Sequence, residues 1–359
     1  MMTKSFPIYR AEFQTEPRSG PRQTSLATQI DGPLAVEPRP RVTLGLPVYN
    51  GDLFISRTLD AMLAQTYDDF EIVICDNAST DHTPEIIEDY AARDSRIRCY
   101  RNPRNMGATY NYNRVLELAS GEYFKWIAAD DVIRPDFLAR CVEVLDADST
   151  IKLVYSKAAF IDENDLVIYR FDDVMTIQAW PEQPVPRTNQ LLEAIFRDGS
   201  AANVIVFGLV RLDTFQAIRP LGNYFGPDFT VVTEIALQGK IHQESGVLSF
   251  YRRHGGSSST YRRTPSAASQ QEFLDPAITG RFRQELQLRR RYFEVFRAIA
   301  NSDLSLGQRT ALGVLVLGLI ARRASWRFRF ELRLLLGRPN ELMTVEQVDG
   351  IGRHWSEFH

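Results

Sequence analysis

Two consecutive carboxylates, Asp130 and Asp131, end the segment GEYFKWIAADD and are followed by the loop proline Pro135. The apolar residues before them predict a buried strand, so the two acids would lie at its carboxyl end. A carboxylate is costly to desolvate unless a cation or a hydroxyl group meets it. Mg²⁺ and Mn²⁺ prefer oxygen ligands and often use one or two carboxylates beside substrate phosphates. The pair therefore predicts a metal-bound nucleotide as the ligand; the alternative is that both acids cap the next helix.

Asp76 follows the apolar run IVIC and lies at the end of another predicted strand. A carboxylate at this place can accept the imide N–H of uracil or thymine, a donor that cytosine lacks. The alternative role is helix capping, for which Ser79, Thr80 and Asp81 are better placed. We therefore expect Asp76 to bind the base, which fits UDP and dTDP equally, and Asp81 to be structural.

The segment PVYN ends the first predicted strand with Pro47, Val48, Tyr49 and Asn50. Its backbone amides and the Asn50 side chain can reach a base or ribose at the carboxyl edge of a parallel sheet. The alternative is a turn that only stops the strand.

The loop RNMGA adds Asn105 and Gly107 as nucleotide-binding candidates, with Gly107 permitting close backbone approach. Arg104 in the same loop is equally compatible with a solvated side chain.

The elements that would position these residues alternate between strand and helix from residue 41 to 131. Helical patterns at 51–67, 83–94 and 109–120 separate four predicted strands, which are RVTLGLPVYN, FEIVICDNAST, IRCYRNP and EYFKWIAADD. Such alternation implies parallel strands with crossover helices. The first part of the chain is thus predicted to be an α/β nucleotide-binding unit.

The later residues predict a helix at PDFLARCVEVLDAD, two strands joined by a turn at 162–165, and a Pro-rich interruption, AWPEQPVPRTN. Helices are then expected at QLLEAIFRDG and TVVTEIALQG, with a strand at SGVLSFYRRH between 245 and 254. From about residue 276 the pattern is helical and rich in arginine.

Composition excludes several classes of protein. The 359 residues are 44% hydrophobic, enough for a sizeable core, and the net charge of −3 argues against nucleic-acid binding. Cys75, Cys99 and Cys141 show no CxxC spacing, which fits a reduced, cytoplasmic setting. Neither a secretory leader nor an apolar stretch of about 18 to 20 residues is found.

Four common catalytic or nucleotide-binding signatures do not occur in this sequence. The absence of GxGxxG and GxxxxGK[ST] weakens a dinucleotide-binding dehydrogenase and a P-loop enzyme. The absence of GxSxG and HExxH weakens the corresponding hydrolases. Phosphate binding must therefore come from other residues.

The order and spacing of several motifs resemble those of family 2 glycosyltransferases, which share the GT-A fold. The resemblance covers residues 41 to about 260 and rests on PVYN, EIVICDNASTD, RNMGA, AADD, PDF near 228 and YRRHGGSSS. It implies an inverting transferase that moves a sugar from a nucleotide diphosphate to an acceptor hydroxyl with a divalent cation, Mg²⁺ or Mn²⁺. We therefore predict an α/β fold of GT-A type, with a mostly parallel central sheet flanked by helices and a C-terminal helical extension.

The resemblance also suggests roles for individual residues. Asp130 would face the ribose and Asp131 the metal, although the two roles could be exchanged. Ala128 stands where the family often has the first acid of Asp-x-Asp, so one acidic ligand is missing. Asp228 occupies the place of the catalytic base, in the loop before TVVTEIALQG, with Pro227 where many relatives have Glu.

Asp228 and the residues at the end of the last predicted strand could each have another role. Asp228 could instead be a helix N-cap, and Glu234 is the second candidate base, although within a helix it is better suited to pairing with a basic neighbour. Arg252 and Arg253 could grip the diphosphate, and neutral His254 could complete the metal shell. The loop 255–260 could close over the donor or be an ordinary surface loop.

The C-terminal region has two interpretations. ALGVLVLGLIA at 311–321 is too short to span a membrane, and the arginines and aromatics after it favour peripheral contact with an anionic leaflet. Alternatively, 311–321 is a core helix and the arginines are solvated or serve a homodimer. The first interpretation would place a cytoplasmic protein at the inner face of the cell membrane.

We divide the chain into a flexible arm (1–38), a catalytic domain (39–265) and an Arg-rich helical region (266–359). Within the catalytic domain, 39–131 would bind the nucleotide and 132–265 the acceptor. The favoured function is a metal-dependent hexosyltransferase that uses a UDP- or dTDP-sugar and a glycan or lipid-linked acceptor in cell-surface glycan or polysaccharide biosynthesis. The alternative is a nucleotide-sugar-binding or scaffolding protein without turnover.

Overall fold

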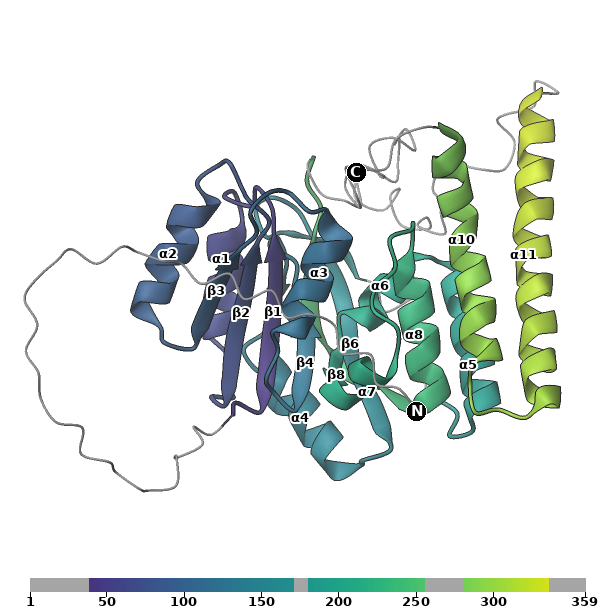
Figure 1. Cartoon of the computed structure of the whole chain (residues 1–359), viewed down its shortest axis with the longest axis horizontal. Coiled ribbons are helices and arrows are strands. Elements are labelled where there is room, and N and C mark those ends of the chain that lie inside the picture. The colour runs from purple at the N-terminus through teal and green to yellow at the C-terminus, as the bar shows by residue number, and fades with distance from the viewer. Residues whose placement is uncertain (1–38, 171–179, 256–280, 336–359) are drawn as a thin grey trace, which may run out of the picture. The chain divides into compact units, whose positions relative to one another are not determined.

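The computed structural model describes residues 39–170, 180–255 and 281–335. The predicted arm over 1–38 and most of the loop 255–260 lie outside the described residues. Within them, nine strands form one mixed sheet with the order β3-β2-β1-β4-β8-β6-β9-β5, and β7 pairs with β6 (Figure 1). The predicted α/β fold is confirmed.

The first half of the sheet is parallel and contains β1 (Val42–Val48), β2 (Phe70–Asp76), β3 (Ile97–Arg101) and β4 (Tyr123–Trp126). The second half mixes directions, since β6 (Ile151–Ile161) runs parallel to β9 (Lys240–Arg252) and antiparallel to β7 and β8. The remaining strands are β5 (Val132–Ile133), β7 (Val167–Arg170) and β8 (Leu209–Arg211).

The helices within the described ranges are α1 (Ile55–Leu63), α2 (Thr83–Arg93), α3 (Ala108–Glu117), α4 (Phe137–Ala147), α5 (Pro184–Arg197), α6 (Ser200–Val206), α7 (Leu212–Ala217), α8 (Pro227–Gln238), α10 (Arg281–Ala300) and α11 (Leu306–Leu335). Two boundaries differ from the prediction. Helix α5 begins at Pro184, inside the expected interruption, because proline needs no N–H partner in the first turn of a helix. Strand β4 ends at Trp126, so Asp130 and Asp131 lie in the loop that follows it.

Two buried hydrophobic clusters hold the helices on the sheet. One joins α1, α2 and α4 to alternate residues of β1 and β2, such as Leu44 and Ile72. The other contains Phe124 and Trp126 of β4 together with residues of α5, α6 and α8. Because side chains alternate along a strand, the two clusters occupy opposite faces of the sheet.

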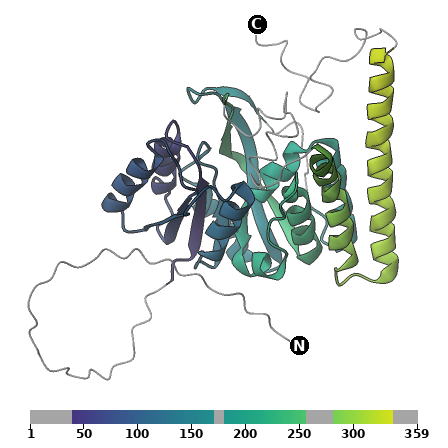
Figure 2. The same cartoon turned by 45° about the horizontal axis from the view of Figure 1, so that its top comes forward.

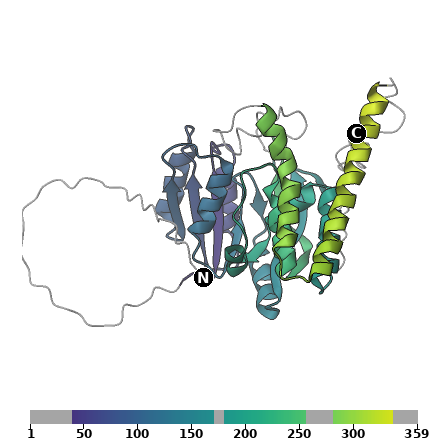
Figure 3. The same ribbon diagram turned by 45° about the vertical axis from the view of Figure 1, so that its right-hand side comes forward.

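The helices α10 and α11 belong to the second cluster. Val295 and Ile299 of α10 and Leu312 and Val316 of α11 are buried in it. Helix α10 packs beside α8, and α11 contacts α5 and α10 (Figure 2, Figure 3). The segment 311–321 is therefore a core helix along one of its faces, as the second interpretation of this region expects.

Arg252, the last residue of β9, ties the loop after β4 to the β6–β7 turn. Its side chain is fully buried and donates hydrogen bonds to the Asp130 carbonyl (2.9 Å), the Asp162 carbonyl (2.7 Å) and an Asp165 carboxylate oxygen (2.5 Å). The guanidinium also lies 4.8 Å from the ring centroid of Phe54, just before α1. These contacts occupy Arg252 within the fold, which corrects the expectation that it grips the diphosphate.

Replacing Arg252 with Met should lower the free energy of unfolding by about 3 kcal/mol, because the Asp130 and Asp162 carbonyls lose their buried donor and Asp165 loses its partner. Arg57 provides a matched control, since it also pairs with Asp165, at 3.1 Å, but is 47% exposed. Arg57→Met should cost less than about 1 kcal/mol. Urea unfolding of the full chain measures both values, and equal costs would contradict the structural role of Arg252.

Candidate functional site

Asp76 lies at the carboxyl end of β2, as predicted, and is 4% exposed. One carboxylate oxygen accepts the Ser79 N–H at 2.9 Å, and the other accepts a hydrogen bond from Arg101. Arg101 ends the neighbouring strand β3, stands opposite Asp76 in register, and also donates to the Ser79 carbonyl at 2.8 Å. A carboxylate oxygen accepts two hydrogen bonds, so Asp76 keeps acceptor capacity beside a fixed positive charge.

Arg101 was missed from the sequence, where it appears as one of several exposed arginines. Its signal was positional, because it ends a parallel strand next to the one that ends in Asp76. Its side chain is 41% exposed, so it reaches the same sheet edge from the solvent side.

The first two residues of the PVYN segment belong to β1, and the last two lie beyond it. Pro47 and Val48 are buried strand residues that pair with Cys75 and Asp76. Tyr49 and Asn50 are exposed beyond the strand, and Asn50 has a φ of 50°. Its side-chain oxygen accepts the Thr80 N–H at 2.8 Å, and its own N–H donates to the Ser79 hydroxyl at 2.9 Å. Asn50 therefore joins the loops that follow β1 and β2.

Four asparagines form a hydrogen-bonded cluster behind these loops. The Asn77 amide donates to Asn105 (2.9 Å), and the Asn102 amide donates to both Asn77 and Asn111 (2.9 Å each). The Asn105 oxygen also accepts the N–H of Gly107 at 2.9 Å, so Asn105 shapes its own loop. Gly107 has a φ of 85° directly before α3, a conformation that glycine adopts without strain.

Asn105 is the only one of these four asparagines that its motif marked as a site residue. Asn111 lies inside α3 and donates to the Cys75 carbonyl at 2.8 Å, so it was hidden in a helical pattern. Asparagine is an unfavourable residue in a helix interior, and that was the available signal.

Asp130, Asp131 and His254 are brought together by the loop after β4 and the end of β9. One Asp131 oxygen accepts the backbone N–H of Arg252 at 2.9 Å. Removal from water and then the charge of Asp130 raise the pKa of Asp131 well above its usual range. The Asp130 carboxylate lies 3.1 Å from Nε2 of His254, whose ring packs 4.7 Å from that of Phe54. The two carboxylates therefore form a concentrated negative charge beside a histidine.

Asp130, Asp131 and His254 could bind a divalent cation only if a bound substrate supplied further ligands to it. Among the side chains that the structure describes, no group of three or more His, Cys, Asp or Glu could hold a metal ion. A cation beside Asp131 would stabilise the charged form of a carboxylate whose pKa is raised by burial and by the neighbouring Asp130 charge. Diphosphate oxygens are the ligands that commonly complete such a shell.

Arg253 directly follows Arg252, the last residue of β9. Its backbone N–H donates to the Ile161 carbonyl at 2.8 Å, and its guanidinium lies 4.2 Å from the Phe160 ring centroid. Its charge partly offsets the upward shift in the pKa of Asp131. Arg253, unlike Arg252, thus brings a cation to the candidate metal and diphosphate region.

Asp228 lies in the first turn of α8 and is 9% exposed. The helix begins at Pro227, earlier than predicted, so Asp228 is a helical residue and not part of the preceding loop. Gly226 is the N-cap, with a φ of 76°, which removes the N-cap interpretation of Asp228. A carboxylate in the first turn is favoured by the helix dipole. Glu234, further along α8, is paired with Arg219 at 2.7 Å.

Part of the chain is similar in sequence to known glycosyltransferases. The chain is 30% identical over 135 residues to an uncharacterised glycosyltransferase of Methanocaldococcus jannaschii, covering 37% of this chain and 47% of that protein. It is 31% identical over 129 residues to chondroitin synthase of Escherichia coli, covering 36% of this chain and 19% of the synthase. The chain thus spans less than half of either relative.

The fold resembles that of a solved structure of TarS from S. aureus, residues 1–349 in complex with UDP-GlcNAc. The TM-score is 0.57 at 18% identity, and the match covers 78% of this chain and 72% of that one. This likeness shows the GT-A fold, with a mixed sheet flanked by helices. The model of glycosyl transferase family 2 matches residues 43–255, more than half of the sequence, and the chain therefore belongs to that family.

Proposed function

We propose that the chain is an inverting glycosyltransferase that uses a UDP- or dTDP-sugar. The observation that carries this proposal is the placement of Asp76, Asn50 and the Asp130–Asp131 pair after three adjacent parallel strands, β2, β1 and β4. The carboxyl ends of neighbouring parallel strands meet at one edge, where α/β proteins bind nucleotides. The base would bind at Asp76, and the ribose at Asp130.

The divalent cation belongs to this proposal. Asp131 and His254 would hold Mg²⁺ or Mn²⁺ together with oxygens of the donor diphosphate, and a bound cation would stabilise the charge on the departing diphosphate. Arg253 would add a fixed positive charge on the same side. The loop residues Asn105 and Gly107 would support the nucleotide through backbone contacts.

Asp228 is the proposed general base. The acceptor oxygen attacks the anomeric carbon, its proton passes to Asp228, and the bond from that carbon to the diphosphate oxygen breaks with its electron pair on the diphosphate. In-line displacement inverts the anomeric centre. Burial in the first helical turn keeps the Asp228 carboxylate in one place, which favours proton transfer.

The acceptor is proposed to be a glycan or lipid-linked glycan of a cell-surface polymer. The similarity to chondroitin synthase supports a role in polysaccharide assembly. The alternative is a protein that binds nucleotide sugars without turnover, which the alanine at position 128 and the single acid at Asp228 favour.

Peripheral contact with an anionic membrane is proposed for α11. Leu312, Val316 and Leu319 are buried on one face, whereas Val314 and Leu317 are 63% and 59% exposed. No helix in the described part of the chain is long and apolar enough to cross a bilayer. The exposed apolar side chains and Arg322 fit the interface of an anionic leaflet. The alternative is that this exposed face of α11 contacts a second copy of the chain in a homodimer.

Nucleotide sugars should stabilise the full chain in a thermal-shift panel of UDP-, dTDP- and GDP-sugars with and without Mn²⁺. Ligand at 100 times its Kd adds about 2.7 kcal/mol of stability, so a specific donor is readily detected. Asp131→Asn should remove the Mn²⁺-dependent part of the shift, whereas Asp89→Asn, a 67% exposed residue of α2, should not. A chain that no nucleotide sugar stabilises would refute the proposed function.

Asp228→Asn should slow UDP release from the selected donor by about 100-fold to 10,000-fold, because proton removal is lost. Its donor-induced thermal shift should stay at the wild-type value. Asp213→Asn, in the exposed part of α7, is the control and should release UDP normally. Release by Asp228→Asn at the wild-type rate would exclude it as the base, and donor binding without release by the wild type would favour the binding-protein alternative.

Val314→Glu combined with Leu317→Glu should reduce flotation with phosphatidylglycerol vesicles by about 10-fold, because two charges would enter the apolar boundary. The control is Leu166→Glu with Val167→Glu, which changes exposed apolar residues of the β6–β7 hairpin. Wild-type protein that does not float would refute membrane contact. A dimer that the α11 variant dissociates would identify the second copy as the occupant.

A further inference from the structure

The segment 218–226 connects α7 to α8 and leads directly to Asp228. On one side it is fixed by Asn113 of α3. The Asn113 amide donates to the Leu221 carbonyl at 2.9 Å, and its oxygen accepts the Leu221 N–H at 2.9 Å. One side chain thus satisfies both backbone groups of a residue 108 positions away, which fixes the position and the orientation of the segment.

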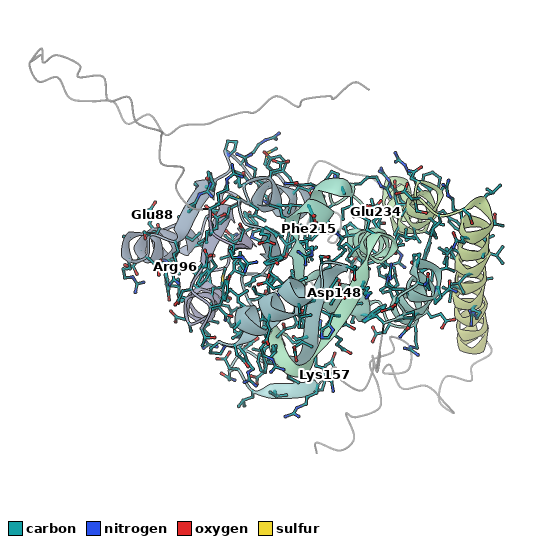
Figure 4. The ribbon with its side chains drawn as sticks, turned by 90° about the horizontal axis from the view of Figure 1, so that it is seen from below. Glu88, Arg96, Asp148, Lys157, Phe215 and Glu234 are labelled. Carbon is teal, nitrogen blue, oxygen red and sulfur yellow. The ribbon has the colours of Figure 1, made fainter. Side chains whose placement is uncertain are left out.

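On the other side the same segment is held by α8 and α10 through Arg219. Its Nε donates to Glu234 of α8, which Figure 4 labels, at 2.7 Å. One terminal nitrogen donates to Glu294 of α10 at 2.5 Å. The other terminal nitrogen donates to the Glu294 carbonyl at 3.2 Å. The Glu234 and Glu294 side chains are only 11% and 6% exposed, whereas Arg219 is 30% exposed, so the pairs are partly shielded from water.

Helix α10 reaches the end of the segment as well. The guanidinium of Arg290 lies 5.5 Å from the Tyr224 ring centroid, and the Tyr224 hydroxyl hydrogen-bonds Thr230 of α8 at 2.7 Å. A Cβ atom placed on Gly226 would lie 3.5 Å from both the Asp228 carboxylate and a terminal nitrogen of Arg291. The first turn of α8 and Arg291 of α10 therefore lie close together around Gly226.

We propose that Asn113 and Glu294 are positioning residues for Asp228 and that α10 completes the acceptor side of the active site. The proposal rests on the function proposed above, in which Asp228 is the base. Asn113 links the base to the helix that follows the nucleotide-binding loop, and Glu294 links it to a helix beyond the family-matched residues 43–255. Neither residue has to touch the substrate for this role.

The test compares UDP release from UDP-GlcNAc, UDP-glucose and UDP-galactose in full-length Asn113→Ala and Glu294→Gln. Each should slow release by about 10-fold to 100-fold, because a small displacement of a reacting group has effects of this size. Affinity for UDP should stay within about 2-fold of wild type, and Glu294→Asp should recover part of the rate. Arg114→Gln on α3 and Phe293→Ala on α10, which is 64% exposed, are controls that should behave as wild type.

The decisive measurement repeats both substitutions in the Asp228→Asn background. Residues that act only through Asp228 should cause no further loss there. Three outcomes would overturn the inference and leave the proposed function intact. The single variants could release UDP within about 2-fold of the wild-type rate, or their affinity for UDP could fall as much as their rate. The substitutions could also slow UDP release as much in the Asp228→Asn background as in the wild type.

Hydrogen exchange gives a readout that needs no turnover. Asn113→Ala and Glu294→Gln should speed exchange of the amides of 219–230 and leave those of β1 and β2 unchanged. If the wild type releases no nucleotide diphosphate from any UDP- or dTDP-sugar of the thermal-shift panel, the proposed function fails, and this measurement still decides whether the two residues fix the segment. Exchange at the wild-type rate in both variants would overturn the inference.

Discussion

The parallel pairing of β2, β1 and β4 is the constraint on which the candidate site depends. In a parallel sheet all strands end at the same edge, so the residues after each strand converge although they are far apart in the sequence. Val48 pairs with Asp76, and Gly45 pairs with Trp126, which sets the loop carrying Asp130 and Asp131 beside the end of β1. The crossover helices α1, α2 and α3 only have to be long enough to return the chain.

An edge that collects carboxylates needs positive charges beside them, and the fold supplies arginines from the strand ends. Arg101 pairs with Asp76, and Arg252 holds the backbone of the loop at Asp130. Arg252 has no exposed surface, and its three acceptors come from two separate segments. A basic residue next to a candidate diphosphate site therefore need not bind phosphate, because it can donate to the backbone carbonyls of the neighbouring loops.

The sequence was sufficient for the first half of the fold because apolar runs of strand length alternated with amphipathic helical segments. It also placed Asp76 at the end of its strand correctly, whereas Asp131 lies in the loop after β4, which ends at Trp126. The ion pairs were not predictable, since Arg101 is 25 residues from Asp76 and Arg252 is 122 residues from Asp130, and only the strand register brings them together. The start of α5 was missed because prolines were interpreted as an interruption, although proline is well suited to the first turn of a helix.

The helix that carries Asp228 packs against residues beyond the end of the family match. Similarity to the family ends at residue 255, but the hydrophobic core that contains Phe229 and Val232 of α8 also contains Val295 and Ile299 of α10. A core cannot be divided at the point where similarity ends, because the apolar surface of α8 would then face water. The acidic residue at the start of α8 is thus held in part by α10, a helix that lies beyond the residues matched by the family model.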